Sequence, residues 1–260
     1  MPMIARTLRT LVLVLMVVAV LYLLACGLLL AFQRSLIYFP QPRAMGSVST
    51  VLDLPRPDAT IKVSIRAHSG PNAMIYFGGN AEDVSLSLLP FSQAFPDQAL
   101  YLMHYRSFGG STGSPSEAAI TADAEALFDT VYKEHTQVTV VGRSLGSGVA
   151  IHLASKRPAA RLVLITPYDS LLQIAIKRMP LFPVKWLLRD TFESWRYAPL
   201  ISVPTLFIAA QDDRIIPRSS TDALFAHFKP GVATLRVIPD SGHNTLSDNP
   251  VYLKLLGGGL

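Results

Sequence analysis

The feature that most constrains the fold is a serine between two glycines, in the stretch Gly142-Arg143-Ser144-Leu145-Gly146. An apolar β-like run at residues 138–141 precedes it, and an amphipathic helix-like run begins near Leu145. A strand that turns directly into a helix crowds the backbone two residues on either side of the serine, where glycine removes the collision. The pattern therefore predicts a tight strand-to-helix turn that exposes the Ser144 hydroxyl in front of the first helical N–H groups.

A second stretch with the same spacing, Gly109-Gly110-Ser111-Thr112-Gly113, shows that the motif alone is weak evidence. It is followed by Ser114-Pro115-Ser116-Glu117, which is typical of a helix start with Ser114 as the capping residue, proline in the first turn and a capping-box glutamate. Residues 109–113 are therefore expected to form a loop before a helix. We expect Ser144, rather than Ser111, to be the nucleophile.

Apolar β-like runs alternate with helix-like segments through the remainder of the chain. The clearest helix spans residues 116 to about 134, with apolar residues from Ile120 to Val131 recurring on one face. The later strands are short continuous apolar runs, as expected where helices cover both faces of a parallel sheet. We therefore predict a doubly wound, mostly parallel α/β domain over residues 61–260. The predicted strands are 61–66, 73–77, 99–104, 137–141, 161–165, 205–209 and 234–238.

The N-terminus contains an uncharged apolar stretch at residues 11–32, about 22 residues or roughly 33 Å as a helix, which is enough to cross a bilayer. We expect residues 1–34 to form an uncleaved membrane anchor. Residues 35–60 then hold a proline-rich connector and the first-strand region.

Two other processing routes are open for this segment. A cleaved signal peptide normally has a shorter apolar region, and here apolar residues 28–31 continue past any small-residue cleavage site. The stretch Leu23-Leu24-Ala25-Cys26 resembles a bacterial lipoprotein signal, in which Cys26 would be lipidated. Apolar residues continue through Phe32, where a lipoprotein would have a polar linker. All three routes place the domain at a membrane or beyond it.

The charges around the span give a small bias in orientation. Arg6 and Arg9 precede it, and Arg34 and Arg43 follow it, so the positive-inside rule is nearly balanced. We expect the N-terminus inside and the domain on the outer, extracytoplasmic side of a single-pass protein. The net charge of +5 is not concentrated in a basic run with interleaved aromatic residues, so no nucleic-acid partner is expected.

Metal and cofactor sites are not expected from the sequence. Cys26, the only cysteine, lies in the apolar span, so the domain has no disulfide and no cysteine ligand cluster. The remaining residues show no cluster with metal-ligand spacing. No glycine-rich dinucleotide fingerprint follows the first strand.

A serine nucleophile near neutral pH needs a base within hydrogen-bond reach and an acid that fixes the tautomer of the base. Asp213 follows the strand predicted at 205–209, and His243 follows the last predicted strand. Both lie just beyond strand ends, where side chains converge at one edge of a parallel sheet. We expect His243 to be the base and Asp213 the acid. The competing carboxylates are Asp212, Asp240 and Asp169.

Acyl chemistry at Ser144 also needs two N–H donors directed at the developing oxyanion. One is expected from Leu145, directly after the nucleophile. The other is expected from Asn80, in the Gly78-Gly79-Asn80-Ala81 loop that follows the strand at 73–77. A plain tight turn is the alternative for this loop, since Gly-Gly-Asn is ordinary turn chemistry.

An insertion of about 37 residues lies between the strands near Ile165 and Val203, and its apolar residues favour a small cap at about 167–202. Packing against the sheet is an equally good interpretation. In a cap, Phe182, Trp186 and Leu187 would line a substrate pocket suited to an apolar acyl chain.

Several spaced stretches carry a family resemblance: Leu36-Ile37-Tyr38-Phe39-Pro40, residues 76–81, residues 105–113, Gly142–Gly146, Phe182-Pro183-Val184-Lys185, the Asp213 turn and Gly242-His243. In these stretches the chain resembles the membrane-anchored, single-domain α/β-hydrolases, often named α/β-hydrolase domain-containing proteins. The chain order Ser144, Asp213, His243 is that of α/β-hydrolases. The family commonly has histidine where this chain has Gly78.

The resemblance implies an α/β-hydrolase fold and serine hydrolase activity, and members of the family include lipid hydrolases and protein depalmitoylases. Together with the anchor and the apolar cap, it favours hydrolysis of carboxylic esters or thioesters in small-molecule or acylated substrates. A serine peptidase on the same fold is one alternative. The other is a non-catalytic, membrane-anchored interaction protein, although such proteins usually lose a member of the triad and this chain keeps all three.

Overall fold

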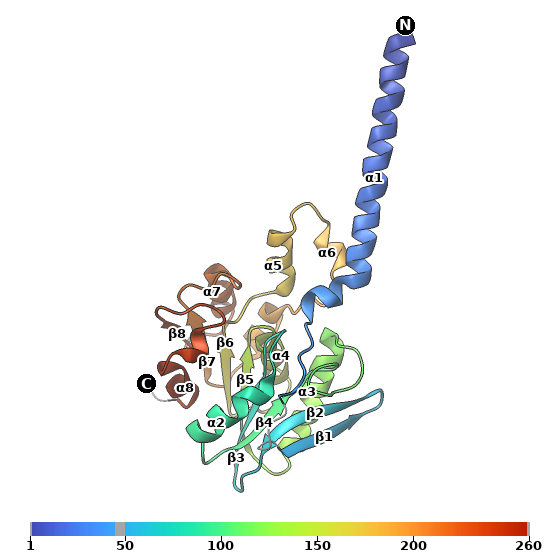
Figure 1. Ribbon diagram of the computed structural model, residues 1–260. Helices are drawn as coiled ribbons and strands as arrows, with labels where there is room; N and C mark the ends of the chain where they lie inside the picture. Colours follow the sequence, from blue (N-terminus) through green and yellow to red (C-terminus); the bar gives the residue numbers. More distant parts are fainter. Residues whose placement is uncertain (1, 45–49, 259–260) are drawn as a thin grey trace.

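The computed structural model describes residues 2–44 and 50–258 (Figure 1). A long helix, α1 (Pro2–Ile37), stands away from an α/β domain that contains the remaining elements. The other helices are α2 (Leu88–Ala94), α3 (Glu117–Val131), α4 (Leu145–Ala154), α5 (Leu171–Arg178), α6 (Val184–Leu187), α7 (Arg218–Ala226) and α8 (Val251–Leu256). Short 3-10 helices are η1 (Val84–Ser87), η2 (Ser194–Arg196), η3 (Ala198–Leu200) and η4 (Leu246–Asp248).

An eight-stranded sheet, ordered β1-β2-β4-β3-β5-β6-β7-β8, forms the centre of the described part of the domain. Strand β2 pairs antiparallel with β1 and β4, and every other neighbouring pair is parallel. The predicted doubly wound, mostly parallel sheet is therefore confirmed. The strands are β1 (Thr50–Arg56), β2 (Ala59–Arg66), β3 (Asn72–Phe77), β4 (Ala99–Met103), β5 (Gln137–Arg143), β6 (Arg161–Ile165), β7 (Thr205–Ala210) and β8 (Ala233–Ile238).

Helices cover both faces of this sheet and bury two separate apolar layers. On one face, Phe128 of α3 and Val149 of α4 belong to the larger layer. On the other face, Phe91 of α2 and Tyr252 of α8 belong to the smaller one. Burial on both faces explains why the central strands read as continuous apolar runs in the sequence.

The seven strands predicted with bounds are present as β2 to β8, and β1 is an eighth, within the segment 35–60 that the sequence assigns to a connector and the first-strand region. Strand β1 lies at the edge of the sheet and pairs only with β2. Asp53 and Pro55 interrupt its apolar pattern. An edge strand tolerates proline because on one side it has no neighbouring strand to receive a backbone N–H. The segment 35–60 therefore contains, besides the connector, a strand whose bounds the sequence pattern did not give.

The start of α3 differs in detail from the sequence prediction. Ser116, not Ser114, is the capping residue, and its Oγ accepts a hydrogen bond from the N–H of Ala119 at 3.2 Å. Glu117 does not form a capping box. Its carboxylate instead accepts the N–H groups of Thr191 and Phe192 at 2.7 and 2.9 Å, and so holds the segment between β6 and β7 against α3.

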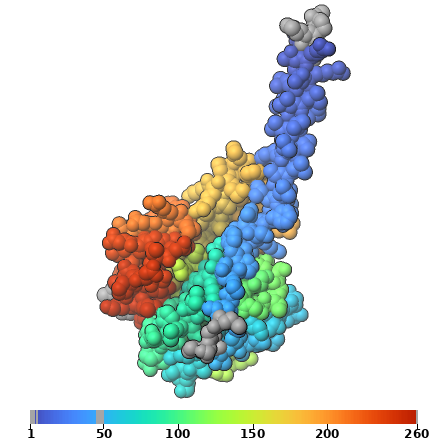
Figure 2. Space-filling view, in the orientation of Figure 1, coloured from blue at the N-terminus to red at the C-terminus, as the bar shows by residue number. Residues whose placement is uncertain are grey.

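Helix α1 has two different surroundings along its length (Figure 2). Most apolar side chains from Leu8 to Leu24 are exposed, and the span Arg6–Ile37 is long and apolar enough to cross a membrane. The C-terminal part contacts the segment that carries α5 and α6, through the ion pair between Arg34 and Asp190 (3.1 Å) among other bonds. The helix therefore continues without a break from the apolar span to the domain.

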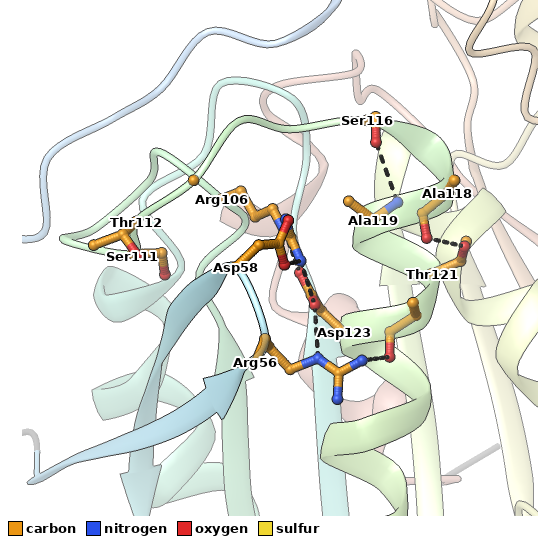
Figure 3. A network of polar contacts seen from close by, with 12 residues as sticks. Arg56, Asp58, Arg106, Ser111, Thr112, Ser116, Ala118, Ala119, Thr121 and Asp123 are labelled. Atoms are coloured by element: carbon orange, nitrogen blue, oxygen red, sulfur yellow. Dashed lines mark hydrogen bonds and ion pairs between the residues drawn. The ribbon is translucent and has the colours of Figure 1, made fainter.

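A buried ion-pair network joins the β1–β2 hairpin to α3 (Figure 3). Arg106, after β4, donates from Nε to Asp123 at 2.8 Å and from both terminal nitrogens to Asp58 at 2.6 and 2.9 Å. Arg56 donates to the other oxygen of Asp123 at 3.0 Å. The bond to Asp123, followed by the bond to Asp58, raises the pKa of Arg106 above its ordinary value. The network thus holds the β1–β2 hairpin against α3.

Replacing Asp123 is expected to destabilise the domain strongly. The side chain is 1% exposed, so Asp123→Ala leaves the Arg106 charge buried with one of its two carboxylates missing. We expect the free energy of unfolding to fall by about 3–5 kcal/mol, measured by urea denaturation of the full chain in detergent and followed by circular dichroism. The control is Asp129→Ala on the same helix, which removes a half-exposed partner of Arg157 and should cost under about 1 kcal/mol. Equal losses of unfolding free energy in the two variants would contradict the role of Asp123 as the buried partner of Arg106.

Candidate active site

Ser144 lies at the tight turn between β5 and α4 that the sequence predicts. Its backbone has φ 50° and ψ −117°, a left-handed conformation that is strained for a residue with a side chain. A Cβ at Gly142 would overlap the carbonyl oxygen of Gly146, and a Cβ at Gly146 would overlap the carbonyl oxygen of Phe77. The crowding argument for both glycines is therefore confirmed.

The structure brings Ser144, His243 and Asp213 into one hydrogen-bonded chain. His243 Nε2 lies 3.0 Å from the Ser144 Oγ, and His243 Nδ1 lies 2.8 Å from an Asp213 carboxylate oxygen. Asp213 is in the loop after β7 and His243 in the loop after β8, at the carboxyl ends of the strands, where Ser144 directly follows β5. With the Nδ1 proton directed at Asp213, Nε2 is free to accept the proton of the serine hydroxyl.

The second oxygen of Asp213 is also satisfied. It accepts the backbone N–H groups of Ile215 and Ile216, both at 2.8 Å. Burial alone would raise the pKa of Asp213, but the hydrogen bond from His243 and the two backbone N–H groups outweigh it, and the pKa lies below its ordinary value. The carboxylate therefore stays ionised and fixed in place.

The carboxylates that competed with Asp213 in the sequence have other surroundings. Asp169 accepts a short hydrogen bond from the Ser220 hydroxyl. The Asp212 backbone N–H donates to the Ser241 carbonyl at 2.9 Å, and Asp240 has a positive φ of 50° in the turn after β8. Among the described residues, Asp213 is the carboxylate in contact with His243.

The second serine motif has a structural role. Ser111 is buried, and its Oγ accepts the backbone N–H of Lys62 at 2.8 Å and donates to the His104 carbonyl at 2.9 Å. These bonds fix the loop before α3 to β2. No histidine ring contacts the Ser111 hydroxyl in the part of the chain that the structure describes.

The loop after β3 lies against Ser144. A Cβ at Gly79 would be 3.8 Å from the Ser144 Cβ, and the Gly79 N–H is already bound to Glu82 at 2.8 Å. The N–H groups of Asn80 and Leu145 have no hydrogen-bond acceptor among the described residues, and both residues line the cavity beside Ser144. A Cβ at Gly78 would lie 2.5 Å from a methyl group of the Val84 side chain, so a larger residue there would require Val84 to move.

Glu82 and Arg143 connect the loops around the site, and the sequence analysis did not identify them. Glu82 accepts hydrogen bonds from the Tyr76 hydroxyl (2.7 Å) and the Gly79 N–H (2.8 Å), and lies 3.8 Å from Arg143. Arg143 donates to the backbone carbonyl of His243 at 3.2 Å. Burial, followed by the charge of Glu82, raises the pKa of Tyr76 well above its ordinary value, so its hydroxyl remains a donor. The signal in the sequence was a charged residue inside the serine motif.

A cavity of about 280 Å³ opens beside Ser144. Its walls are mainly apolar residues of α1, α5, α6 and the loop after β7, together with Gln33 and Arg178, and Ser144, Leu145, Asn80 and Tyr168 lie at one end. Of the three residues predicted for the pocket, only Leu187 is in its wall. Phe182 is not in the wall and stacks on Tyr22 of α1, and Trp186 is also outside the wall and is 83% exposed. The cap segment does border the cavity, through Val184 and Leu187 of α6, whereas Trp186 of the same helix is turned outward.

No cluster of three or more histidine, cysteine, aspartate or glutamate residues that could hold a metal ion occurs in residues 2–44 and 50–258.

Comparison with known proteins agrees with this geometry. No protein-family model matches the chain. The uncharacterized protein Rv2307c of Mycobacterium tuberculosis is 32% identical over 262 residues, which cover 92% of each chain. The alpha/beta hydrolase domain-containing protein aho-3 of Caenorhabditis elegans is 32% identical over 156 residues, 58% of this chain and 46% of aho-3. The chain belongs to the alpha/beta hydrolase domain-containing proteins.

Solved structures show the same α/β-hydrolase fold. The esterase Pf2001 of Pyrococcus furiosus superimposes with a TM-score of 0.64 over 85% of this chain and 95% of its own, at 16% identity. At that identity the likeness establishes the fold.

Glu82 is expected to act as a positioning residue for this alpha/beta hydrolase. Glu82→Ala releases the Gly79 N–H and leaves Arg143 without its carboxylate, so the Asn80 donor moves relative to Ser144. We expect kcat for a short p-nitrophenyl ester to fall about 10–100-fold with little change in KM, because oxyanion contacts act in the transition state. Glu82→Gln keeps an acceptor for Gly79 and should recover most of the loss. A change confined to KM, or no rescue by glutamine, would contradict this role.

Proposed function

We propose that the chain is a serine hydrolase that cleaves carboxylic esters or thioesters of apolar acyl groups. The observation that carries the proposal is the hydrogen-bonded chain from the Ser144 Oγ through His243 to Asp213, at 3.0 and 2.8 Å, at the end of an apolar cavity. A relay of this kind is what makes a serine hydroxyl nucleophilic near neutral pH.

The arrangement supports a two-step acyl transfer. Ser144 Oγ attacks the carbonyl carbon while its proton passes to His243 Nε2, and the tetrahedral intermediate collapses as His243 returns the proton to the leaving alcohol or thiol. Water then attacks the acyl-enzyme, again giving its proton to His243, and the acid is released with Ser144 restored. Asp213 stabilises the imidazolium in both steps. The N–H groups of Asn80 and Leu145 are the proposed donors to the oxyanion.

The cavity supports an acyl substrate over a peptide. Its wall contains Leu29, Ile174 and Val184 among other apolar residues, and no carboxylate occurs among the described residues that line it. A peptidase that binds a free amine would need such a carboxylate. Thioesters and oxyesters present the same acyl group to this wall, so both bond types belong to the proposal.

The proposed location is a membrane, with α1 as a single-pass anchor. The support is the apolar span within Arg6–Ile37, whose most apolar window is not buried in the protein. With Arg6 and Arg9 on the inner side, the domain lies on the outer side.

The direct test of the nucleophile is labelling by a fluorophosphonate probe. We expect the full chain in detergent to be labelled and Ser144→Ala to lose the label completely, because the probe phosphonylates only an activated serine. Ser111→Ala is the matched control and should keep the label. Labelling that survives in Ser144→Ala, or an unlabelled wild type, would mean that Ser144 is not an activated nucleophile and would favour a non-catalytic role.

Removal of the base tests the mechanism. His243→Ala should lower kcat for a short p-nitrophenyl ester by about 10⁴-fold or more, with an unchanged circular dichroism spectrum. Asp213→Asn should give a loss of similar order, because the imidazole is then held in the wrong tautomer. The parallel variant Asp212→Asn should stay close to wild type. A drop of only a few-fold in His243→Ala would identify another residue as the base.

A further inference from the structure

The tip of the cap lies beside the apolar part of α1. The Tyr22 hydroxyl donates to the Leu181 carbonyl at 2.9 Å, and the Tyr22 ring stacks on Phe182 with centroids 5.9 Å apart and planes 5° from parallel. Leu181 and Phe182 belong to the loop between α5 and α6. Figures 1 and 2 show this loop reaching toward the N-terminal end of α1, away from the sheet.

A second set of contacts fixes the base of the cap to the same helix. Gln33 donates to the Leu187 carbonyl at 2.9 Å and accepts the Arg189 N–H at 2.6 Å. Tyr22 and Gln33 are eleven residues apart, about 16 Å along a helix. The cap is therefore held parallel to α1 over that distance, and its tip points the same way as the N-terminus of α1.

The position of the bilayer on α1 then places the cap tip inside it. Arg9 cannot lie within the hydrocarbon without a large cost. Counted from Arg9, a core of about 30 Å takes about 20 helical residues and ends near Leu29. Tyr22 is seven residues before Leu29, about 10 Å inside that boundary in an untilted helix. The loop bound to Tyr22 lies at the same level.

The exposed large apolar side chains of the cap are suited to the hydrocarbon region of a bilayer. Leu181 is 81% exposed and Trp186 is 83% exposed, an unusual exposure for two large apolar side chains on one small segment. Trp186 directly precedes Leu187, whose carbonyl accepts a hydrogen bond from Gln33 of α1. Trp186 therefore lies near the boundary between the hydrocarbon core and the headgroups, where tryptophan is enriched. Lys185, beside Trp186 on α6, and Lys177 on α5 are the nearby exposed lysines, and their long side chains can extend toward the headgroups.

Arg178, next to Lys177, is turned away from this surface. Its guanidinium donates to the carbonyl of Ile215, at 2.8 Å, and to that of Arg214, so the charge lies over the loop that carries Asp213. The tip from Met179 to Phe182 itself carries no charge.

The catalytic cavity begins at the same boundary. Leu29, Gln33, Leu36 and Ile37 of α1 form one wall, α5 and α6 form the other, and Ser144 is at the far end. An acyl chain lying along α1 in the membrane therefore has a largely apolar path into the cavity, with Gln33 and Arg178 as the polar side chains of α1 and α5 along it.

We propose that the cap loop 179–182 and the outer face of α6 are embedded in the bilayer beside α1, and that the substrate's acyl chain enters the cavity laterally from the lipid. The occupant of the exposed cap surface is the acyl region of the bilayer. The route of entry rests on the proposed hydrolase function, whereas the insertion of the cap does not.

Insertion can be measured without any activity, because Trp186 and Trp195 are the only tryptophans of the chain. Trp195→Phe leaves Trp186 as the fluorophore, and Trp186→Phe leaves Trp195, which packs against His227 of the domain. The full chain is reconstituted in phosphatidylcholine vesicles that carry a nitroxide at carbon 5 or carbon 12 of the acyl chain. We expect Trp186 to be quenched, more strongly by the carbon-5 label, and Trp195 to be unaffected.

A third variant reports the tip. In a chain with both tryptophans replaced by phenylalanine, Leu181→Trp should be quenched more strongly by the carbon-12 label, because the tip lies deeper than α6. Quenching of Trp186 and of the residue-181 reporter by aqueous iodide, instead of by the lipid labels, would overturn the proposal. Shielding from both kinds of quencher would also overturn it, because another protein surface would then cover the cap.

The entry route is tested by activity. Leu181→Asp should reduce hydrolysis of a long-chain ester embedded in vesicles by at least about tenfold, while hydrolysis of a soluble short ester stays unchanged. Leu89→Asp replaces a half-exposed leucine on α2, away from α1, and should alter neither rate. Equal rates on the embedded ester in Leu181→Asp and wild type would overturn lateral entry. A wild type inactive on both esters would instead contradict the hydrolase proposal, and the quenching would still decide the insertion.

Discussion

The close approach of β5 and α4 is the constraint on which the site depends. At Gly142 and Gly146 the backbone of the turn, the helix and the end of β3 come together with no space for a side chain. This contact forces Ser144 into a left-handed conformation and directs its hydroxyl out of the sheet edge. The same contact brings the loop after β3 against Ser144. The N–H groups of Asn80 and Leu145, the proposed oxyanion donors, are therefore positioned by the same packing of β3, β5 and α4.

The loops that complete the site are coupled through a polar group beneath it. Glu82 binds the loop after β3, Arg143 belongs to the turn itself, and Arg143 holds the backbone of the loop that carries His243. Three segments far apart in the sequence therefore share one buried ion pair. Asp213 is held independently by two amides of its own loop, so the acid has its own local support.

Helix α1 is part of the domain as well as a long apolar span. Its C-terminal half supplies one wall of the cavity, and Asn80 binds its last turn through the side chain, which donates to the Ile37 carbonyl at 2.8 Å. The cap, the catalytic loop and the apolar helix thus meet at one place. With α1 as the proposed anchor, this arrangement would hold the candidate active site at a fixed distance from the membrane surface.

The sequence by itself determined the order of the candidate site residues along the chain: the serine turn, the carboxylate after β7 and the histidine after β8. It also determined that an apolar helix precedes the domain. These are local signals, because glycine crowding, apolar periodicity and strand ends are read within a few residues. It did not determine the bounds and pairing of the edge strand β1, the contacts of Glu82 and Arg143, or which face of the cap lines the cavity. Those depend on contacts between residues such as Tyr22 and Phe182, which are distant in the chain. Only the tertiary structure decides these features, because the free energy of such a contact depends on a partner residue distant in the chain, which the local sequence pattern does not identify.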